Sequence, residues 1–395
     1  MWDNVTLMTN GRTQLQTARA GAFAEVGSNH SAVGPSSRLS VGRVLMLTMV
    51  SYVTYLYTVS RFVNYSDFTK GYGDNSPYVA IASAIEHWDF SQLHVKLFWG
   101  LPYAVTALSA ITRIPNLPSL IVISGLASLA AIILTCKLWG GWVAVAFVIL
   151  SREWLERSLL GGAEPLFLAL LFGAFLAARK QRWGLAASLA SLATVVRPMG
   201  IFALAGIGIA LLFRRDFRKL AAAAAIGLAI GTLYALPLKL YVGDSLANVN
   251  GYGQADWNSK SPVSFPFAAI VHNALGGSAT ELNLARSGVW IAFILLAAIL
   301  IARKVSIREY SKSLPMEATF WALYLIFLFT YNSPWARDQF PRFAIPLVPF
   351  SAFSMERWIP RSYWLLLILG LVSAVLSATE TVGIMNVVGM VRKAI

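Results

Sequence analysis

The sequence predicts an all-α protein that crosses a membrane many times. Of its 395 residues, 57% are hydrophobic and only 13% are charged, and the mean hydropathy is +0.63. A soluble domain carries about 25% charged residues. Apolar runs near the ~20 residues that a helix needs to cross the hydrocarbon core recur from Val41 to the C-terminus. We therefore expect roughly eleven transmembrane helices, with extracytoplasmic loops that form the functional site.

An apolar run predicts each span, and the basic residues beside the runs predict its direction through the membrane. Lys and Arg concentrate in cytoplasmic loops, which places residues 179–182 and 214–219 inside and sets the direction of every other run. The expected spans are 43–63, 117–136, 141–150, 164–178, 183–196, 199–213, 220–242, 287–302, 316–331, 343–355 and 362–378. The runs at 141–150 and 343–355 are short, so they need buried placement or a locally thin bilayer.

The segment 97–111 is apolar but short, and Pro102 is expected to break it. In this threading it starts and ends outside, so we expect a re-entrant or interfacial segment that lines a cavity. The alternative is a true span, which would shift the later topology by one crossing. The outer loops then comprise about 64–96, 243–286 and 332–342.

The remaining composition narrows the class of protein. Residues 1–40 are polar and predict a disordered cytoplasmic tail, while residues 41–395 form one membrane domain. The single cysteine, Cys136, excludes intramolecular disulfides and a cysteine-based metal site. The net charge of +14 is explained by short basic clusters between apolar runs, so we expect no nucleic-acid partner.

Charged residues on the outer side are candidates for function. Glu164 opens one apolar run and Arg197 ends the next, so both face away from the basic loop between the two runs. An ionisable residue at a bilayer edge costs a few kcal/mol unless it is paired, solvated or used. A helix-end anchor or a plain ion pair remains an alternative for these two residues.

Asp74 lies in the first outer loop, just before a surface helix expected over residues 78–88. Its residue type and position alone favour a helix N-cap, in which the carboxylate accepts backbone hydrogen bonds. A catalytic role needs further support.

Three patches supply that support: GDNSPYVAIASAI, AEPLFLALLFGAFLAARKQRWGLAASLASLATVVRPMGI and QFPRFAIPLVPF. Together they resemble the GT-C superfamily of integral-membrane glycosyltransferases, and the middle patch is similar to the PIG-V-like mannosyltransferase branch. The resemblance implies transfer of a sugar, with mannose suggested by the branch, from a polyprenyl-phosphate donor. The reaction would invert the sugar's configuration on the extracytoplasmic face of the inner (plasma) membrane.

The resemblance also implies roles for individual residues. Asp74 matches the acid that serves as base toward the acceptor hydroxyl. Arg342 matches the late arginine motif and is the first candidate for binding the donor phosphate, followed by Arg197 and Arg337. We expect four further residues to bind substrate, namely Glu164, Tyr78, His87 and Lys96.

The sequence is compatible with a site that holds a metal ion or a second acid, and with one that holds neither. The superfamily pattern has two adjacent acids, whereas here Asn75 follows Asp74. Asp67 and Asp89 are the other available acids, and Asp74 and Asp89 are the metal candidates. His87, next to Asp89, could serve a metal or a proton relay, or could be a solvated histidine at the interface.

Two other functions remain as alternatives to a glycosyltransferase. A transporter or flippase of polyprenyl-linked saccharides would place polar residues in the middle of several spans, and these spans are nearly free of charge there. A non-catalytic membrane partner would use the outer loops for docking. The sequence leaves the acceptor open among glycans, lipids and proteins.

Overall fold

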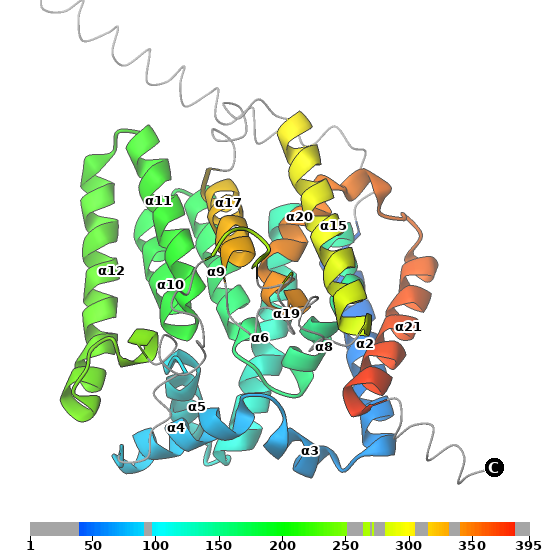
Figure 1. Ribbon diagram of the computed structural model, residues 1–395, viewed down its shortest axis with the longest axis horizontal. Helices are drawn as coiled ribbons and strands as arrows, with labels where there is room; N and C mark the ends of the chain where they lie inside the picture. Colours follow the sequence, from blue (N-terminus) through cyan, green and yellow to red (C-terminus); the bar gives the residue numbers. More distant parts are fainter. Residues whose placement is uncertain are drawn as a thin grey trace, which may run out of the picture. The chain divides into compact units, whose positions relative to one another are not determined.

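The computed structural model describes residues 39–90, 97–250, 264–268, 271, 281–304, 315–331 and 340–383. Contacts divide the chain into residues 1–38 and one larger unit, residues 39–395, to which every described residue belongs. The expected tail therefore lies outside the described residues, except for Leu39 and Ser40. All regular elements in the described ranges are helices, which confirms the all-α prediction (Figure 1).

Most of the expected spans correspond to helices with nearly the expected bounds. They are α2 (Val41–Phe62), α6 (Asn116–Trp139), α7 (Gly141–Leu150), α9 (Glu164–Arg179), α10 (Trp183–Val196), α11 (Ile201–Phe213), α12 (Phe217–Pro237, continued by a π-helical turn, Leu238–Val242), α15 (Glu281–Lys304), α17 (Pro315–Thr330) and α21 (Tyr363–Val382).

Only some of these helices are long and apolar enough to cross a membrane by themselves. In the described ranges these are α6, α12 with its π-helical turn, and α21. The pair formed by α8 (Arg152–Leu159) and α9 would be a fourth span, bent by 106°. Several other helices are apolar but shorter, and the number of about eleven crossings stays a prediction.

The helices pack around α9. Helix α6 lies against one side of α9 and α10 against another, while α12 packs on α10, α17 on α11 and α21 on α2. Helix α7 is buried over nearly its whole length, which agrees with the buried placement expected for this short run. Helix α12 is mostly exposed and presents Leu228, Leu233 and Leu236, as expected for a surface that faces lipid.

Three short helices follow α2 and form one end of the bundle. They are α3 (Tyr65–Gly71), α4 (Asn75–His87) and α5 (Gly100–Thr112), drawn in blue and cyan in Figure 1. Helix α4 packs against both α5 and α6. The side chain of Asn64 caps α3, and its Oδ1 accepts hydrogen bonds from the backbone N–H groups of Ser66 and Asp67.

The expectation that Pro102 breaks the segment 97–111 is wrong. Pro102 lies in the first turn of α5, where its missing N–H is not needed for an intrahelical bond, so the helix is continuous. A helix of this length extends for about 20 Å, less than the ~30 Å of the hydrocarbon core. Thr106 Oγ1 donates to the carbonyl of Ala82 at 3.0 Å, so α5 is bonded to α4. The re-entrant placement stays a prediction.

The run 343–355, expected as one span, is instead broken. It consists of α19 (Phe340–Ala344), a 3₁₀ turn (Ile345–Leu347) and α20 (Val348–Ser354). Pro346 and Pro349 interrupt a regular helix because proline lacks an N–H and clashes with the preceding turn. These segments are buried among the other helices, so they need not cross a bilayer as one continuous span.

Candidate active site

The antiparallel pair of α9 and α10 carries an ion pair at each end. At the end that the sequence places outside, Arg197 Nη1 lies 3.1 Å from Glu164 Oε1; the Glu164 side chain is buried and that of Arg197 is only 12% exposed. At the other end, Arg179 Nε donates to Glu317 Oε1 of α17 at 2.7 Å. The prediction that Glu164 and Arg197 lie opposite the basic loop is therefore consistent with the helix pairing.

Local sequence places Glu164 and Arg197 at their helix ends. Pro165 pre-sets the helical backbone angle in the first turn of α9, and an acid in that turn interacts favourably with the helix dipole. Helix α10 ends at Arg197 because the next residue is Pro198, which disfavours a helical conformation before it. Arg197 is extended and its guanidinium lies 5.8 Å from the centre of the Phe343 ring.

Arg342 joins the two carboxylates of the site. Its Nε donates to Glu164 Oε1, and its Nη2 donates to Asp74 Oδ2 at 2.7 Å. Helix α19 is held in place by Tyr324 of α17, whose hydroxyl donates to the carbonyl of Phe343 at 2.6 Å. Arg342 thus links α4, α9 and α19, which are far apart in the sequence.

Asp74 occupies the N-cap position of α4 but does not cap it. Its side chain makes no cap hydrogen bond and is directed toward Arg342 instead. Burial alone would raise the pKa of Asp74, but the guanidinium groups of Arg342 and Arg157 outweigh that effect and hold the pKa below its usual range. The carboxylate is therefore ionised near neutral pH and able to accept a proton.

Asn75, at the place where the superfamily pattern has a second acid, joins α4 to the turn before α9. Its Nδ2 donates to the carbonyls of Thr69 and Leu160, at 2.8 and 2.6 Å. A carboxylate could not make these bonds because it has no N–H group. The turn brings Gly161, at φ +104°, so close that an added Cβ would lie 2.7 Å from Asn75 Oδ1. Asn75 therefore positions Asp74 beside the α8–α9 turn.

Helix α8 supplies an arginine that the sequence analysis did not select. Arg157 is buried, with its guanidinium 5.1 Å from the centre of the Tyr72 ring. An added Cβ on Gly73 would lie 2.6 Å from Arg157 Nη1, so Arg157 lies directly under the residue before Asp74. The segment REWLER, with four charges between two apolar runs, is a signal that could have revealed this amphipathic helix.

A buried hydrogen-bond network fixes α8 to its neighbours. Glu156 accepts hydrogen bonds from Tyr72 and Thr381, each at 2.8 Å, and forms an ion pair with Arg152 at 2.7 Å. Burial raises the pKa of the Tyr72 hydroxyl, so this group is neutral and donates its proton to Glu156. The network holds the helix that carries Arg157 against α21 and the C-terminal end of α3.

Of the other predicted site residues, one lies in the cluster, one lies far from it and two fall outside the described residues. Tyr78 lies buried one turn after Asp74 and within electrostatic range of Arg197, so it joins the cluster. His87 lies at the far end of α4, where Nδ1 contacts the carbonyl of Ser83 at 2.9 Å. It is therefore about 20 Å from Asp74 along the helix axis. Lys96 and Arg337 lie outside the described residues.

The arrangement does not fit a metal site. Helix α4 separates Asp89 from Asp74 by about 20 Å, so the two proposed metal ligands cannot bind one ion. Within the described ranges, no three acidic, histidine or cysteine side chains come together as ligands. Asp74 and Glu164 instead face arginines, and Asp67 is exposed and paired with Lys70 at 3.0 Å.

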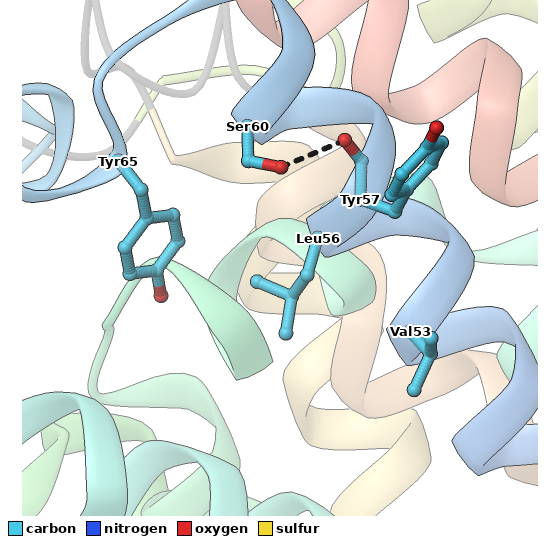
Figure 2. Close-up of a pocket in the computed structure, with 5 residues that line it drawn as sticks. All are labelled: Val53, Leu56, Tyr57, Ser60 and Tyr65. Atoms are coloured by element: carbon cyan, nitrogen blue, oxygen red, sulfur yellow. Dashed lines mark hydrogen bonds between the residues drawn. The ribbon is translucent and has the colours of Figure 1, made fainter.

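An apolar groove lies beside this end of the bundle. It has a volume of about 420 Å³ and is formed by one face of α2 and the first residue of α3. Figure 2 shows its lining residues, which are Val53, Leu56, Tyr57, Ser60 and Tyr65. The hydroxyl of Tyr65 donates to the carbonyl of Leu159 at the end of α8, two residues from Arg157. The groove is therefore connected to the element that carries Arg157.

Comparison with known families identifies the class of enzyme. Residues 97–330 match the sequence model of glycosyltransferase family 87. The chain belongs to this family. This glycosyltransferase matches the expected GT-C superfamily, whereas the PIG-V-like branch stays a prediction. Family membership favours the transferase over the transporter and the non-catalytic partner.

A solved structure supports the fold. This glycosyltransferase is similar to ArnT from Cupriavidus metallidurans, crystallised with undecaprenyl phosphate, with a TM-score of 0.52 and 13% identity. The match covers 84% of this chain and 63% of ArnT, so the chain spans less than two thirds of ArnT's length. Among curated protein sequences, none matches this glycosyltransferase. The likeness to ArnT supports a multi-pass membrane protein.

Proposed function

We propose that this glycosyltransferase moves a sugar, with inversion, from a polyprenyl-phosphate donor to an acceptor hydroxyl on the extracytoplasmic face of the inner (plasma) membrane. The observation that carries the proposal is the Asp74–Arg342–Glu164–Arg197 cluster, in which an ionised carboxylate pairs with the buried Arg342 and Glu164 joins Arg342 to Arg197. Proton acceptance by a carboxylate and stabilisation of a leaving phosphate by arginines are the two needs of this reaction.

Asp74 acts as the base in this mechanism. The acceptor hydroxyl attacks the anomeric carbon as its proton passes to a carboxylate oxygen of Asp74. The bond between the anomeric carbon and the phosphate oxygen breaks, and its electron pair remains on the polyprenyl phosphate. A single displacement of this kind inverts the anomeric configuration, and a positioned base typically contributes about 10² to 10⁴ in rate.

Arg342 and Arg197 stabilise the leaving phosphate. The guanidinium group offers a planar set of donors that matches phosphate oxygens and keeps its charge at all accessible pH values. Through Oε1, Glu164 accepts a hydrogen bond from Arg342 and forms an ion pair with Arg197, so it fixes their positions before the donor binds. This preorganisation lowers the reorganisation needed as negative charge develops on the phosphate.

The donor's lipid chain occupies the groove on α2 in this proposal. The groove is apolar and lies on a face where Val53 and Tyr57 are exposed, so a prenyl chain could enter it sideways from the bilayer. Its connection to α8 through Tyr65 brings the chain toward the charged cluster. ArnT has been crystallised with a lipid phosphate of this class, which supports the choice of donor.

Mannose is the sugar that we propose, on the PIG-V-like resemblance of the middle sequence patch. The acceptor is a hydroxyl of a glycan, a lipid or a protein. A hydroxyl acceptor is the only property that Asp74 as base requires.

The proposal is tested with purified protein in detergent and a panel of polyprenyl-phosphate sugars with a mixed acceptor extract. We expect release of polyprenyl phosphate from the mannose donor by wild type, and a loss of about 10² to 10⁴ in Asp74→Asn. Asp67→Asn is the matched control because Asp67 is exposed and lies on the same outer segment. Full activity in Asp74→Asn would remove the proposed base, and saturable binding without turnover of any donor would favour a flippase.

A further inference from the structure

Arg157 is the arginine of the cluster that forms no ion pair with Asp74 or Glu164. Its Nε and Nη1 are buried and have no hydrogen-bond partner among the described residues. Glu164 Oε2, close to Arg157 across Gly162, is also buried without a partner there. Buried polar atoms are nearly always hydrogen-bonded in folded proteins, so a group of unused donors and an unused acceptor points to a missing ligand.

The close backbone approach around Arg157 depends on two glycines. An added Cβ on Gly162 would lie 2.9 Å from Arg157 Cδ and 2.8 Å from Glu164 Oε2. An added Cβ on Gly73 would lie 2.6 Å from Arg157 Nη1, and Gly73 also has φ +53°, a conformation that favours glycine. The Arg157 side chain thus lies with its guanidinium against Gly73, next to Asp74, and its Cδ against Gly162, two residues before Glu164.

The charges of the described cluster do not balance. Three guanidinium groups, those of Arg157, Arg197 and Arg342, face two carboxylates, those of Asp74 and Glu164. Both carboxylates form ion pairs with Arg342, and Glu164 also pairs with Arg197. Arg157 interacts with Asp74 and Glu164 only at longer range. Among these five side chains the surplus is one positive charge; of the other buried carboxylates on α8, Glu156 is paired with Arg152 and Glu153 lies one turn before Arg157.

We infer that Arg157 is a third phosphate-binding arginine of the donor site, which completes its hydrogen bonds only when the donor is present. This inference rests on the proposed function. The phosphodiester of a polyprenyl-phosphate sugar carries one negative charge, which matches the surplus. Its non-bridging oxygens accept from Nε and Nη1, and a sugar hydroxyl donates to Glu164 Oε2. The donor therefore satisfies both kinds of unused group.

Two measurements on Arg157→Gln test this role: the melting temperature without ligand and the affinity for decaprenyl phosphate in detergent. We expect the unliganded variant to be about as stable as wild type, since Arg157 forms no ion pair with either carboxylate of the cluster. We expect affinity to fall by about 10- to 100-fold, as for the loss of charge-assisted hydrogen bonds. Arg157→Lys keeps the charge but not the planar donors, so its affinity for decaprenyl phosphate should lie between those of wild type and Arg157→Gln.

Arg179→Gln is the matched control at the other end of α9. It should lower the melting temperature, because it leaves Glu317 buried without its partner, and should leave affinity unchanged. A lower melting temperature of unliganded Arg157→Gln would mean that the guanidinium already has a counter-ion, and would overturn the inference. Wild-type affinity in that variant would overturn it as well. If wild type itself binds no polyprenyl phosphate, the proposed function fails and the inference fails with it.

Discussion

The two ends of the α9–α10 pair each hold an ion pair between an arginine and a buried glutamate, yet they differ in how completely their polar groups are used. At the basic end, Arg179 contacts Glu317 and the carbonyl of Leu138, and neither charged residue leaves a buried nitrogen or oxygen without a partner in the described ranges. At the opposite end, Glu164 has two arginine partners and still has an unpartnered oxygen.

This difference separates a structural anchor from the proposed ligand site. The Arg179–Glu317 pair stabilises the contact between α9 and α17. Neither of its side chains has a buried donor or acceptor that lacks a partner in the described ranges. A cluster with surplus charge and unused donors is less stable by itself and is best explained by a partner that supplies the missing charge. The same helices therefore carry a structural ion pair at one end and the proposed site at the other.

The largest expected effects on stability and activity come from replacing Arg342 at one end of the α9–α10 pair and Arg179 at the other. Arg342→Gln leaves Asp74 and Glu164 without a shared partner, which should cost about 3–5 kcal/mol of stability and abolish measurable transfer. Arg179→Gln should cost a similar amount of stability but retain activity per folded molecule. Thermal unfolding and turnover of both variants test this. Equal loss of activity in the two variants would contradict the distinction between the ends.

The next effect concerns Asn75, which we expect to act as a donor. Asn75→Asp removes the N–H groups that bond the carbonyls of Thr69 and Leu160. Each unsatisfied carbonyl should cost about 1–3 kcal/mol, and displacement of Asp74 should lower turnover. The matched control is Asn64→Asp, because Asn64 acts as an acceptor in capping α3 and aspartate can replace it. Equal stability of the two variants, measured by thermal unfolding, would contradict this role.

A smaller effect is expected from pH. The pKa of Asp74 is lower in the folded protein than its usual value, so the stability it contributes is present above that usual value and is lost as pH falls through the folded pKa. The difference in melting temperature between wild type and Asp74→Asn should be constant from about pH 7 to 5 and shrink below about pH 4. A difference that grows on acidification would mean that the pKa is raised instead.

The smallest expected effect concerns the groove on α2. Val53→Trp fills part of the groove and should raise the KM for the lipid donor a few-fold, with kcat and melting temperature unchanged. Val372→Trp on α21 is the control, since Val372 is also exposed and apolar but does not line the groove. Steady-state kinetics with donor chains of different length would check it. An equal change in KM for both variants would place the lipid chain elsewhere.

Much of the fold could be predicted from the sequence because apolar runs and basic loops are strong local signals. Helices α2, α6, α7, α9 and α10 begin and end close to the predicted residues. The breaks in the run 343–355 were harder to foresee, since proline breaks a helix in one position and fits its first turn in another. Pro346 and Pro102 illustrate the two cases.

The site could be predicted only in part because its residues meet through tertiary packing. Asp74, Glu164, Arg197 and Arg342 were selected by position and resemblance, and the structure brings them together. His87 was selected from the same outer loop but lies one helix length away. Arg157 was missed because it lies on a short amphipathic helix of eight residues between two apolar runs, and such a helix gives no signal of its own in a search for apolar runs.

The most direct test of a base at Asp74 is a single-turnover measurement on Asp74→Asn with donor already bound. The acceptor is added, and formation of the glycosidic bond is followed alongside donor affinity. The account predicts that donor affinity remains within a few-fold of wild type while the chemical step slows by about 10² to 10⁴. An unchanged chemical step, or a slow step that is explained by lost donor binding, would contradict it.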